Sequence, residues 1–86
     1  MPTVCVFRGI YIRLYYHDHS PPHFHALYQG MEAKTAIDTL DIIDGQLPAR
    51  IVKLITDWAR ANKSALQENW QRAESRAPLL PISPLE

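Results

Sequence analysis

Residues 17–25 have the sequence His17-Asp18-His19-Ser20-Pro21-Pro22-His23-Phe24-His25. All four histidines of the 86-residue chain lie in this stretch, two on either side of Ser-Pro-Pro. The two prolines donate no ladder hydrogen bonds and fix φ, so a β-strand cannot continue through them. The stretch therefore predicts a turn that separates two strands and brings two His-x-His pairs toward each other.

Alternating side chains predict strands on both sides of this turn. Residues 10–16 place Ile10, Ile12 and Leu14 on one face of the chain, which is typical of a half-buried strand. Glycine at Arg8-Gly9 and at Gln29-Gly30 indicates tight hairpin turns. The other predicted strands cover residues 3–7, 23–28, 31–37 and 39–43, and Asp44-Gly45 ends the sheet.

Two helices are predicted after the sheet. Pro48 is suited to the first position of a helix. A buried helical face is indicated by the i, i+3, i+4, i+7 spacing of Ile51, Leu54, Ile55 and Trp58. Ser64 followed by Gln67 resembles a capping box that begins a second helix, and Pro78 ends it.

These patterns predict one α+β domain, with a small antiparallel sheet of three to five strands followed by two α-helices. The strand-rich half with the His-rich turn covers residues 1–47, and the helices cover residues 48–77. Residues 78–86 have proline at every third position, which favours an extended tail. Free strand edges in such a sheet make a homodimer plausible.

The composition excludes several classes of protein. Nine basic residues balance nine acidic ones, which argues against strong non-specific nucleic-acid binding. The lone Cys5 forms neither an internal disulfide nor a zinc-thiolate framework. No apolar stretch has membrane-spanning length, and no leader pattern precedes the first strand, so we expect a cytoplasmic protein with no membrane partner.

Three interpretations of the His-rich stretch stay open. In the first, His23 and His25 on one face of a strand, with His19 across the turn, bind a divalent transition metal, and Asp18 is a ligand or fixes a tautomer. In the second, two histidines act as base and acid in cleaving an RNA phosphodiester, and Arg13 stabilises the charge on the phosphate. In the third, the histidines hold the turn against the sheet and have no chemical role.

The helical half is the more basic half. Residues 1–47 have three basic and five acidic residues, whereas residues 48–76 have six basic and three acidic ones. This asymmetry indicates an interaction surface. Its candidate contacts to a protein partner or to nucleic acid are Arg50, Lys53 and Arg60.

Several stretches together resemble a family of short bacterial proteins. They are Met-Pro-Thr-Val at the start, Asp18-His19, Pro21-Pro22-His23-Phe24-His25-Ala26, Gly45 before Leu47-Pro48, Trp58, Trp70 and the closing Pro-Ile-Ser-Pro-Leu. The family is catalogued as domain of unknown function number four thousand one hundred and sixty. The resemblance makes motif positions of His19, Pro22, His23, Phe24 and His25, and His17 is outside the pattern.

The resemblance also implies a role for the protein. Members of the family are often encoded beside another small domain, which implies a toxin–antitoxin-like pair with a small protein partner. We therefore expect one of three functions. The chain is a component of such a module, with nucleic acid as a candidate target, or a metal-binding protein that uses His19, His23 and His25, or an interaction module with a structural turn. Whether it is an enzyme is left open.

Overall fold

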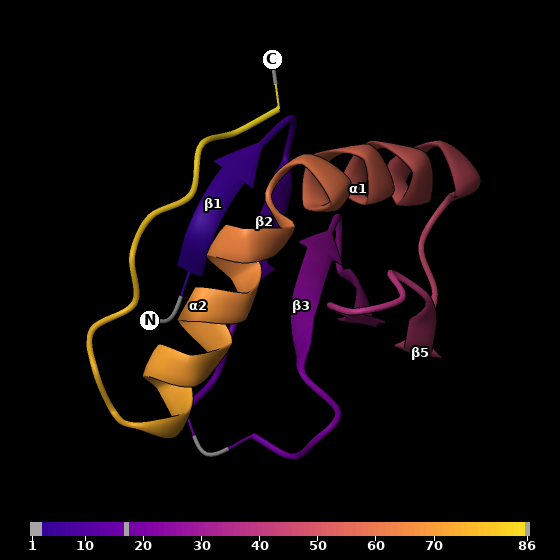
Figure 1. The fold of residues 1–86 in the computed structure, drawn as a ribbon. Helices are drawn as coiled ribbons and strands as arrows, with labels where there is room; N and C mark the ends of the chain where they lie inside the picture. Colours follow the sequence, from indigo (N-terminus) through magenta and orange to yellow (C-terminus); the bar gives the residue numbers. More distant parts are fainter. Residues whose placement is uncertain (1–2, 17, 86) are drawn as a thin grey trace.

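A computed structural model describes residues 3–16 and 18–85 of the chain. It confirms the predicted α+β class, because a five-stranded antiparallel sheet is followed by two helices (Figure 1). The strands are β1 (Thr3–Phe7), β2 (Ile10–Arg13), β3 (His23–Tyr28), β4 (Met31–Ala36) and β5 (Ile42–Gly45). They lie in the order in which they follow one another in the chain. The helices are α1 (Ala49–Ala61) and α2 (Lys63–Glu74).

Two of the hairpins have the turns that the sequence indicates. Arg8 and Gly9 have φ values of 49° and 78°, and Gln29 and Gly30 have φ values of 47° and 79°. Positive φ at both central residues defines a type I′ turn, whose twist matches that of the flanking strands. The second turn pairs Tyr28 with Met31 and thereby sets the register of β3 against β4.

The fifth strand differs from the prediction, which placed it at residues 39–43. Leu40 has a φ of 64°, and its backbone N–H donates to the carbonyl of Ala36, so the chain turns here. The strand begins only at Ile42 and includes the Asp44-Gly45 pair that was expected to end the sheet. A Cβ on Gly45 would lie 2.2 Å from the backbone oxygen of Glu32, so close packing against β4 requires glycine here.

The predicted capping box of the second helix does not form. Asn62 is the N-cap residue of α2, and no side chain in the described part of the chain caps the helix. The amide of Gln67 donates instead to Asp38, which lies after β4. The helix ends at Glu74, before Pro78. A tertiary contact thus takes the side chain that the local pattern assigned to capping.

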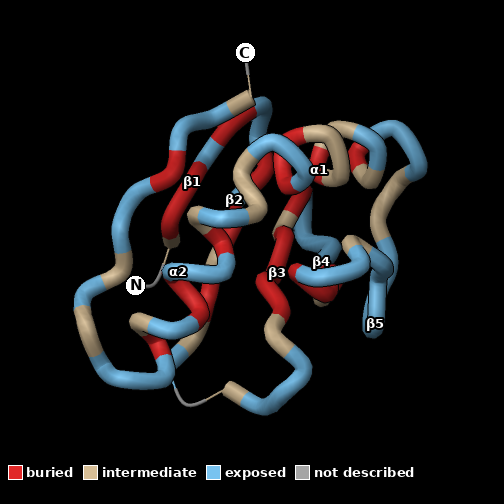
Figure 2. The backbone as a smooth tube through the Cα atoms, in the orientation of Figure 1, coloured by how far each residue is buried: buried red, intermediate tan, exposed pale blue. Residues whose placement is uncertain are grey.

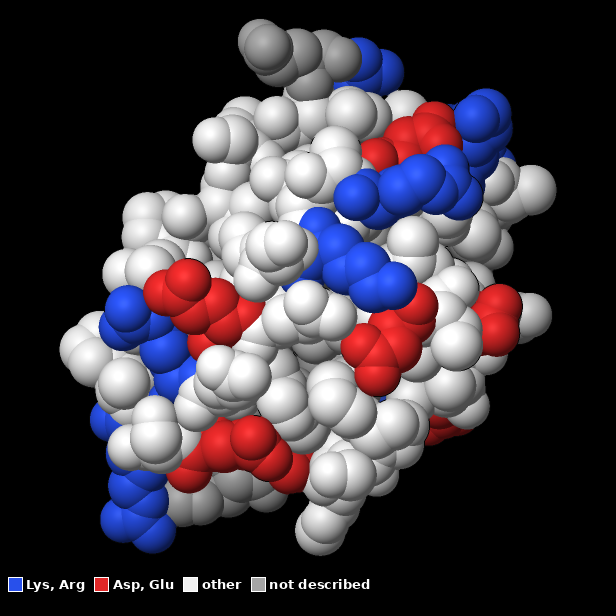
Figure 3. Space-filling view, in the orientation of Figure 1, with Lys and Arg blue, Asp and Glu red and all other residues white. Residues whose placement is uncertain are grey.

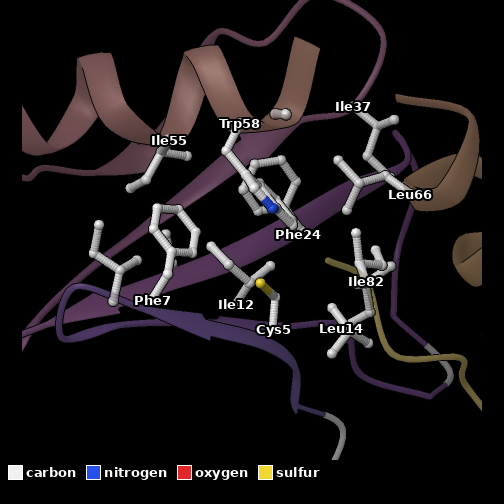
Figure 4. Close-up of a cluster of buried hydrophobic side chains, with 14 of the residues drawn as sticks. Cys5, Phe7, Ile12, Leu14, Phe24, Ile37, Ile55, Trp58, Leu66 and Ile82 are labelled. Carbon is white, nitrogen blue, oxygen red and sulfur yellow. The ribbon is translucent and has the colours of Figure 1, made fainter. Parts of the chain in front are cut away.

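The hydrophobic core lies between the sheet and the helices (Figure 4). Trp58 of α1 is fully buried, and its ring centroid lies 5.7 Å from that of Phe7 and 6.0 Å from that of Phe24. Leu66 of α2 and Ile82 of the tail complete the cluster. Neither helix in the described part of the chain combines the length and the apolarity that a membrane crossing requires.

The C-terminal tail runs alongside β1 (Figure 1). The backbone N–H of Ile82 donates to the carbonyl of Val4 over 2.8 Å. The amide of Asn69, which is only 1% exposed, bonds both the carbonyl and the N–H of Leu80. The indole of Trp58 donates to the carbonyl of Ser83. The tail therefore covers the β1 edge of the sheet.

Candidate functional site

The site is formed where the β2–β3 connection folds back onto β3. Phe24 points into the core against Trp58, and alternation along the strand turns the neighbouring His25 the other way. The ring centroids of His23 and His25 lie 5.1 Å apart. Asp18, on the connection, reaches both rings.

One carboxylate oxygen contacts both imidazoles. Oδ2 of Asp18 lies 3.0 Å from Nε2 of His23 and 3.0 Å from Nε2 of His25. The contact with His25 has the geometry of a hydrogen bond. The contact with His23 does not, although its distance is equally short. Among the described residues, Nε2 of His23 is the only buried side-chain polar atom without a hydrogen-bond partner.

The other nitrogen of each ring faces an oxygen that can only accept. Nδ1 of His23 lies 2.8 Å from the carbonyl oxygen of Pro21, and Nδ1 of His25 lies 2.7 Å from Oε2 of Glu32. Each Nδ1 must therefore carry a proton and donate it. In a neutral imidazole this leaves a lone pair on Nε2. A lone pair and a carboxylate repel each other, so a proton or a metal ion between Nε2 and Oδ2 of Asp18 makes each contact favourable.

The two imidazoles are shielded from water, whereas the carboxylates reach it. The His23 ring lies 5.3 Å from the ring of Trp70, and Tyr15 meets the His25 ring edge-on at 4.6 Å. The histidine side chains are 4% and 8% exposed, against 18% for Asp18 and 46% for Glu32. A ligand from solvent therefore approaches the site from the carboxylate side.

The Asp18 carboxyl is held in its ionised form. Burial acts to raise its pKa, but hydrogen bonds from His25 and from the His19 backbone N–H, together with the charges of His23 and His25, outweigh burial. The pKa of Asp18 therefore lies below its ordinary value. The site thus supplies an anionic oxygen beside two imidazole nitrogens at neutral pH.

The structure brings together two of the three histidines named from the sequence. His23 and His25 meet at the site, but His19 is exposed, and only its backbone N–H contacts Asp18, at 2.9 Å. Among the described residues, the group of side chains able to hold a metal ion consists of Asp18, His23 and His25. His17 lies outside the described residues.

Arg13 lies directly opposite His25 in the β2–β3 register. Its Nε donates to the Thr3 hydroxyl over 3.1 Å, and its guanidinium carbon lies 5.8 Å from the centroid of the Tyr11 ring. These contacts direct its side chain toward β1 and Tyr11. Its proposed role beside a phosphate stays a prediction.

Glu32 was not identified as a site residue from the sequence. The two-residue turn at residues 29–30 pairs Leu27 with Glu32 and His25 with Lys34. Glu32 is thus diagonal to His25 across the hairpin, within reach of a long side chain. A type I′ hairpin at Gln29-Gly30 fixes this register, so the turn alone would have predicted that Glu32 lies near His25.

The predicted basic residues of α1 lie on an exposed surface. Lys53 and Arg60 both contact Asp57, at 3.0 and 3.5 Å, and their side chains are 78% and 68% exposed. Arg50 donates to the hydroxyl of Tyr28 over 3.1 Å. On the face shown in Figure 3, acidic side chains accompany the basic ones around α1. Binding of a partner or of nucleic acid by these residues stays a prediction.

Comparison with known proteins identifies the family but no characterised relative. No curated protein and no solved structure matches the chain. A family model described as Domain of unknown function (DUF4160) matches residues 9–71. This range contains the whole turn, β2 to β5 and α1, and it leaves out the first strand and the tail. The match spans well over half of the sequence, and the chain therefore belongs to the DUF4160 family.

Proposed function

We propose that the protein binds a divalent transition metal ion through Nε2 of His23, Nε2 of His25 and Oδ2 of Asp18. The observation that carries the proposal is the buried, unpartnered Nε2 of His23, which faces the carboxylate oxygen that His25 also contacts. A buried polar atom without a partner costs about 1–3 kcal/mol. A metal ion bound between the three atoms removes this cost at His23 and offsets the negative charge of Asp18.

The spacing of the three atoms suits one metal ion. Ligand bonds of about 2.0–2.2 Å separate neighbouring ligand atoms by about 3.0 Å at right angles and by about 3.4 Å in a tetrahedron. Both nitrogen-to-oxygen distances are 3.0 Å, and all three atoms lie within 4.8 Å of one another. Small side-chain movements are therefore enough to bring them into coordination distance.

The surroundings of the histidines support the same proposal. A histidine that ligates a metal through one nitrogen usually donates its other N–H to a carbonyl or a carboxylate, which fixes the tautomer and the ring orientation. Pro21 provides the carbonyl for His23, and Glu32 provides the carboxylate for His25. Both rings thus have the outer partners that metal-binding histidines have.

The ligand set indicates which metals fit. Two imidazoles and one carboxylate accept zinc, iron(II), nickel or cobalt, and the absence of thiolate disfavours copper(I). Three protein ligands leave coordination positions for water or a substrate, as in catalytic rather than structural metal sites. Because Asp18 and Glu32 are more exposed than the two histidines, these positions face solvent.

Metal analysis of protein purified without an affinity tag tests the proposal. We expect about one bound ion per chain, and an affinity for Zn²⁺ that Asp18→Asn lowers by about 100-fold, because the amide replaces an anionic ligand. The matched control is His19→Ala, which removes an exposed histidine from the same connection and should change the affinity by no more than about twofold.

Two results would overturn the proposal. The first is wild-type protein that binds well under one ion per chain when titrated with Zn²⁺ against a competing chelator. The second is an equal loss of affinity in His19→Ala and Asp18→Asn, which would indicate adventitious binding by the exposed loop. Thermal melts of each metal-free variant establish that it is folded before its affinity is compared.

We also propose that the protein acts with a small protein partner in a toxin–antitoxin-like module. The support is the family resemblance together with Lys53 and Arg60, which extend from α1 into solvent. Expression should arrest growth, and co-expression of the neighbouring gene product should restore it. The variant Lys53→Glu/Arg60→Glu should lose this rescue or the arrest itself. The proposal is contradicted if the native host grows normally while it expresses the protein. If the only effect of expression is a loss of cellular RNA, nucleic acid is the target.

A further inference from the structure

The two edges of the sheet differ in what covers them. The tail hydrogen-bonds to β1 through Ile82 and Val4. At the opposite edge, β5 pairs with β4, and no further strand pairs with it among the described residues. An edge strand presents an outer row of backbone N–H and C=O groups that can pair with another chain. The β5 edge is therefore the side of the sheet that is available for strand addition.

The β5 edge also exposes apolar side chains. All four of its residues are exposed, as the pale blue strand in Figure 2 shows. Ile42 is 37% and Ile43 is 45% exposed. The β4–β5 register shifts between the pairs Lys34–Asp44 and Thr35–Ile42, so Ile43 is the extra residue of a β-bulge. An added strand could cover the exposed apolar surface of both isoleucines.

Acidic side chains outnumber basic ones around this edge. Residues 38–46 contain Asp38, Asp41 and Asp44 and no lysine or arginine. Asp41 and Asp44 flank the two isoleucines and are exposed. On the neighbouring strand, Glu32 adds a further carboxylate, and Lys34 lies directly opposite Asp44. A strand that docks here meets acidic side chains at both ends of its apolar contact.

We propose that β5 docks an extended segment of a partner protein in which apolar residues alternate with lysine or arginine. Backbone pairing supplies the affinity in this mode of recognition, and the side chains supply the specificity. Ile42 and Ile43 contact the apolar residues, and Asp41 and Asp44 pair with the basic ones. The inference does not depend on the metal site, because neither His23 nor His25 belongs to this edge.

A second copy of the chain fits this edge poorly. A symmetric dimer would pair two β5 strands antiparallel and place Asp41 and Asp44 of one copy beside those of the other. Like charges opposite each other on paired strands are destabilising. The same carboxylates attract a basic strand, so charge complementarity selects the partner.

Peptide titration followed by amide NMR tests the proposal. The probes are two short capped peptides, one of alternating valine and lysine and one of alternating valine and glutamate. We expect saturable shifts at residues 41–46 with the lysine peptide, and an affinity about tenfold or more above that of the glutamate peptide. Asp41→Lys/Asp44→Lys should reverse this preference, and Ile43→Thr should weaken binding of the lysine peptide.

The matched control is Glu68→Lys/Glu74→Lys, which makes the same charge change on exposed positions of α2. It should leave the affinity within about twofold, and thermal melts confirm that each variant is folded. The proposal is overturned if the lysine peptide shifts only Asp18 and Glu32, if both peptides bind equally, or if no shift saturates by about 1 mM. It is also overturned if the protein dimerises in a manner that Ile43→Lys abolishes, since the occupant is then a second copy.

Discussion

Strands β3 and β5 belong to one sheet but reverse the usual relation between polarity and burial. The central strand β3 buries two histidines, whereas the edge strand β5 exposes two isoleucines. Burying a polar group costs free energy unless it is satisfied, and exposing an apolar one forgoes the gain of burial. Each strand therefore carries a cost that folding alone does not explain. β3 is therefore the candidate for ligand binding, and β5 is the candidate for contact with a partner chain.

The largest expected effect tests how much of the stability depends on β3. Phe24 is fully buried against Trp58, so Phe24→Ala leaves a cavity and should lower the free energy of unfolding by about 3–5 kcal/mol. Urea denaturation measures this loss. A decrease below about 1 kcal/mol would mean that β3 is not the centre of the core.

A smaller effect concerns the contacts of Asp18 with the histidines of β3. Asp18→Asn in metal-free protein should lower the free energy of unfolding at pH 7 by about 1.5–3 kcal/mol, because hydrogen bonds to a charged group are lost. The pKa of Asp18 is lower in the folded than in the unfolded state, so its contribution is complete above the unfolded value of about 3.9.

The same variant gives a pH dependence with a defined sign. As the pH falls below about 3.9 and through the still lower folded pKa of Asp18, the stability advantage of the wild type over Asp18→Asn should disappear. Denaturation curves from pH 7 down to acid measure the difference. A difference that stays constant, or grows, on acidification would contradict the assigned role of the carboxylate.

A third prediction concerns Glu32, which orients His25 but is not one of the proposed metal ligands. Glu32→Gln keeps an acceptor for Nδ1 of His25 but removes the charge, and it should weaken Zn²⁺ binding by about 10- to 100-fold. Because Glu32 is 46% exposed, the melting temperature of the metal-free protein should hardly change. Unchanged Zn²⁺ affinity would show that Glu32 does not orient the histidine.

The smallest effect is expected at β5. Ile43→Ala removes a side chain that is 45% exposed, and the free energy of unfolding should change by no more than about 0.5 kcal/mol. Urea denaturation of Ile43→Ala and Phe24→Ala under the same conditions compares the contributions of β5 and β3 to the free energy of unfolding. A loss as large as that of Phe24→Ala would show that Ile43 belongs to the core and would remove the basis for docking at this edge.

Local sequence patterns predicted most of the fold. The Arg8-Gly9 and Gln29-Gly30 turns, the bounds of β3 and the buried face of α1 depend on short-range backbone preferences and on side-chain periodicity. The position of β5 and the start of α2 were predicted wrongly. At β5 the turn is local, but it places a positive φ on Leu40, a residue type that does not signal such a turn. At α2 a contact between distant segments, the bond from Gln67 to Asp38, takes the side chain that the local pattern assigned to capping.

The sequence by itself determined that the histidines gather at a proline turn and that His23 and His25 share one face of a strand. Only the tertiary structure decided that Asp18 and Glu32 meet these rings while His19 faces solvent. The physical reason is that alternation specifies which way a side chain points along its own strand. Which groups meet it there depends on sheet register and on the path of the connecting chain, and these are set by packing across the whole domain.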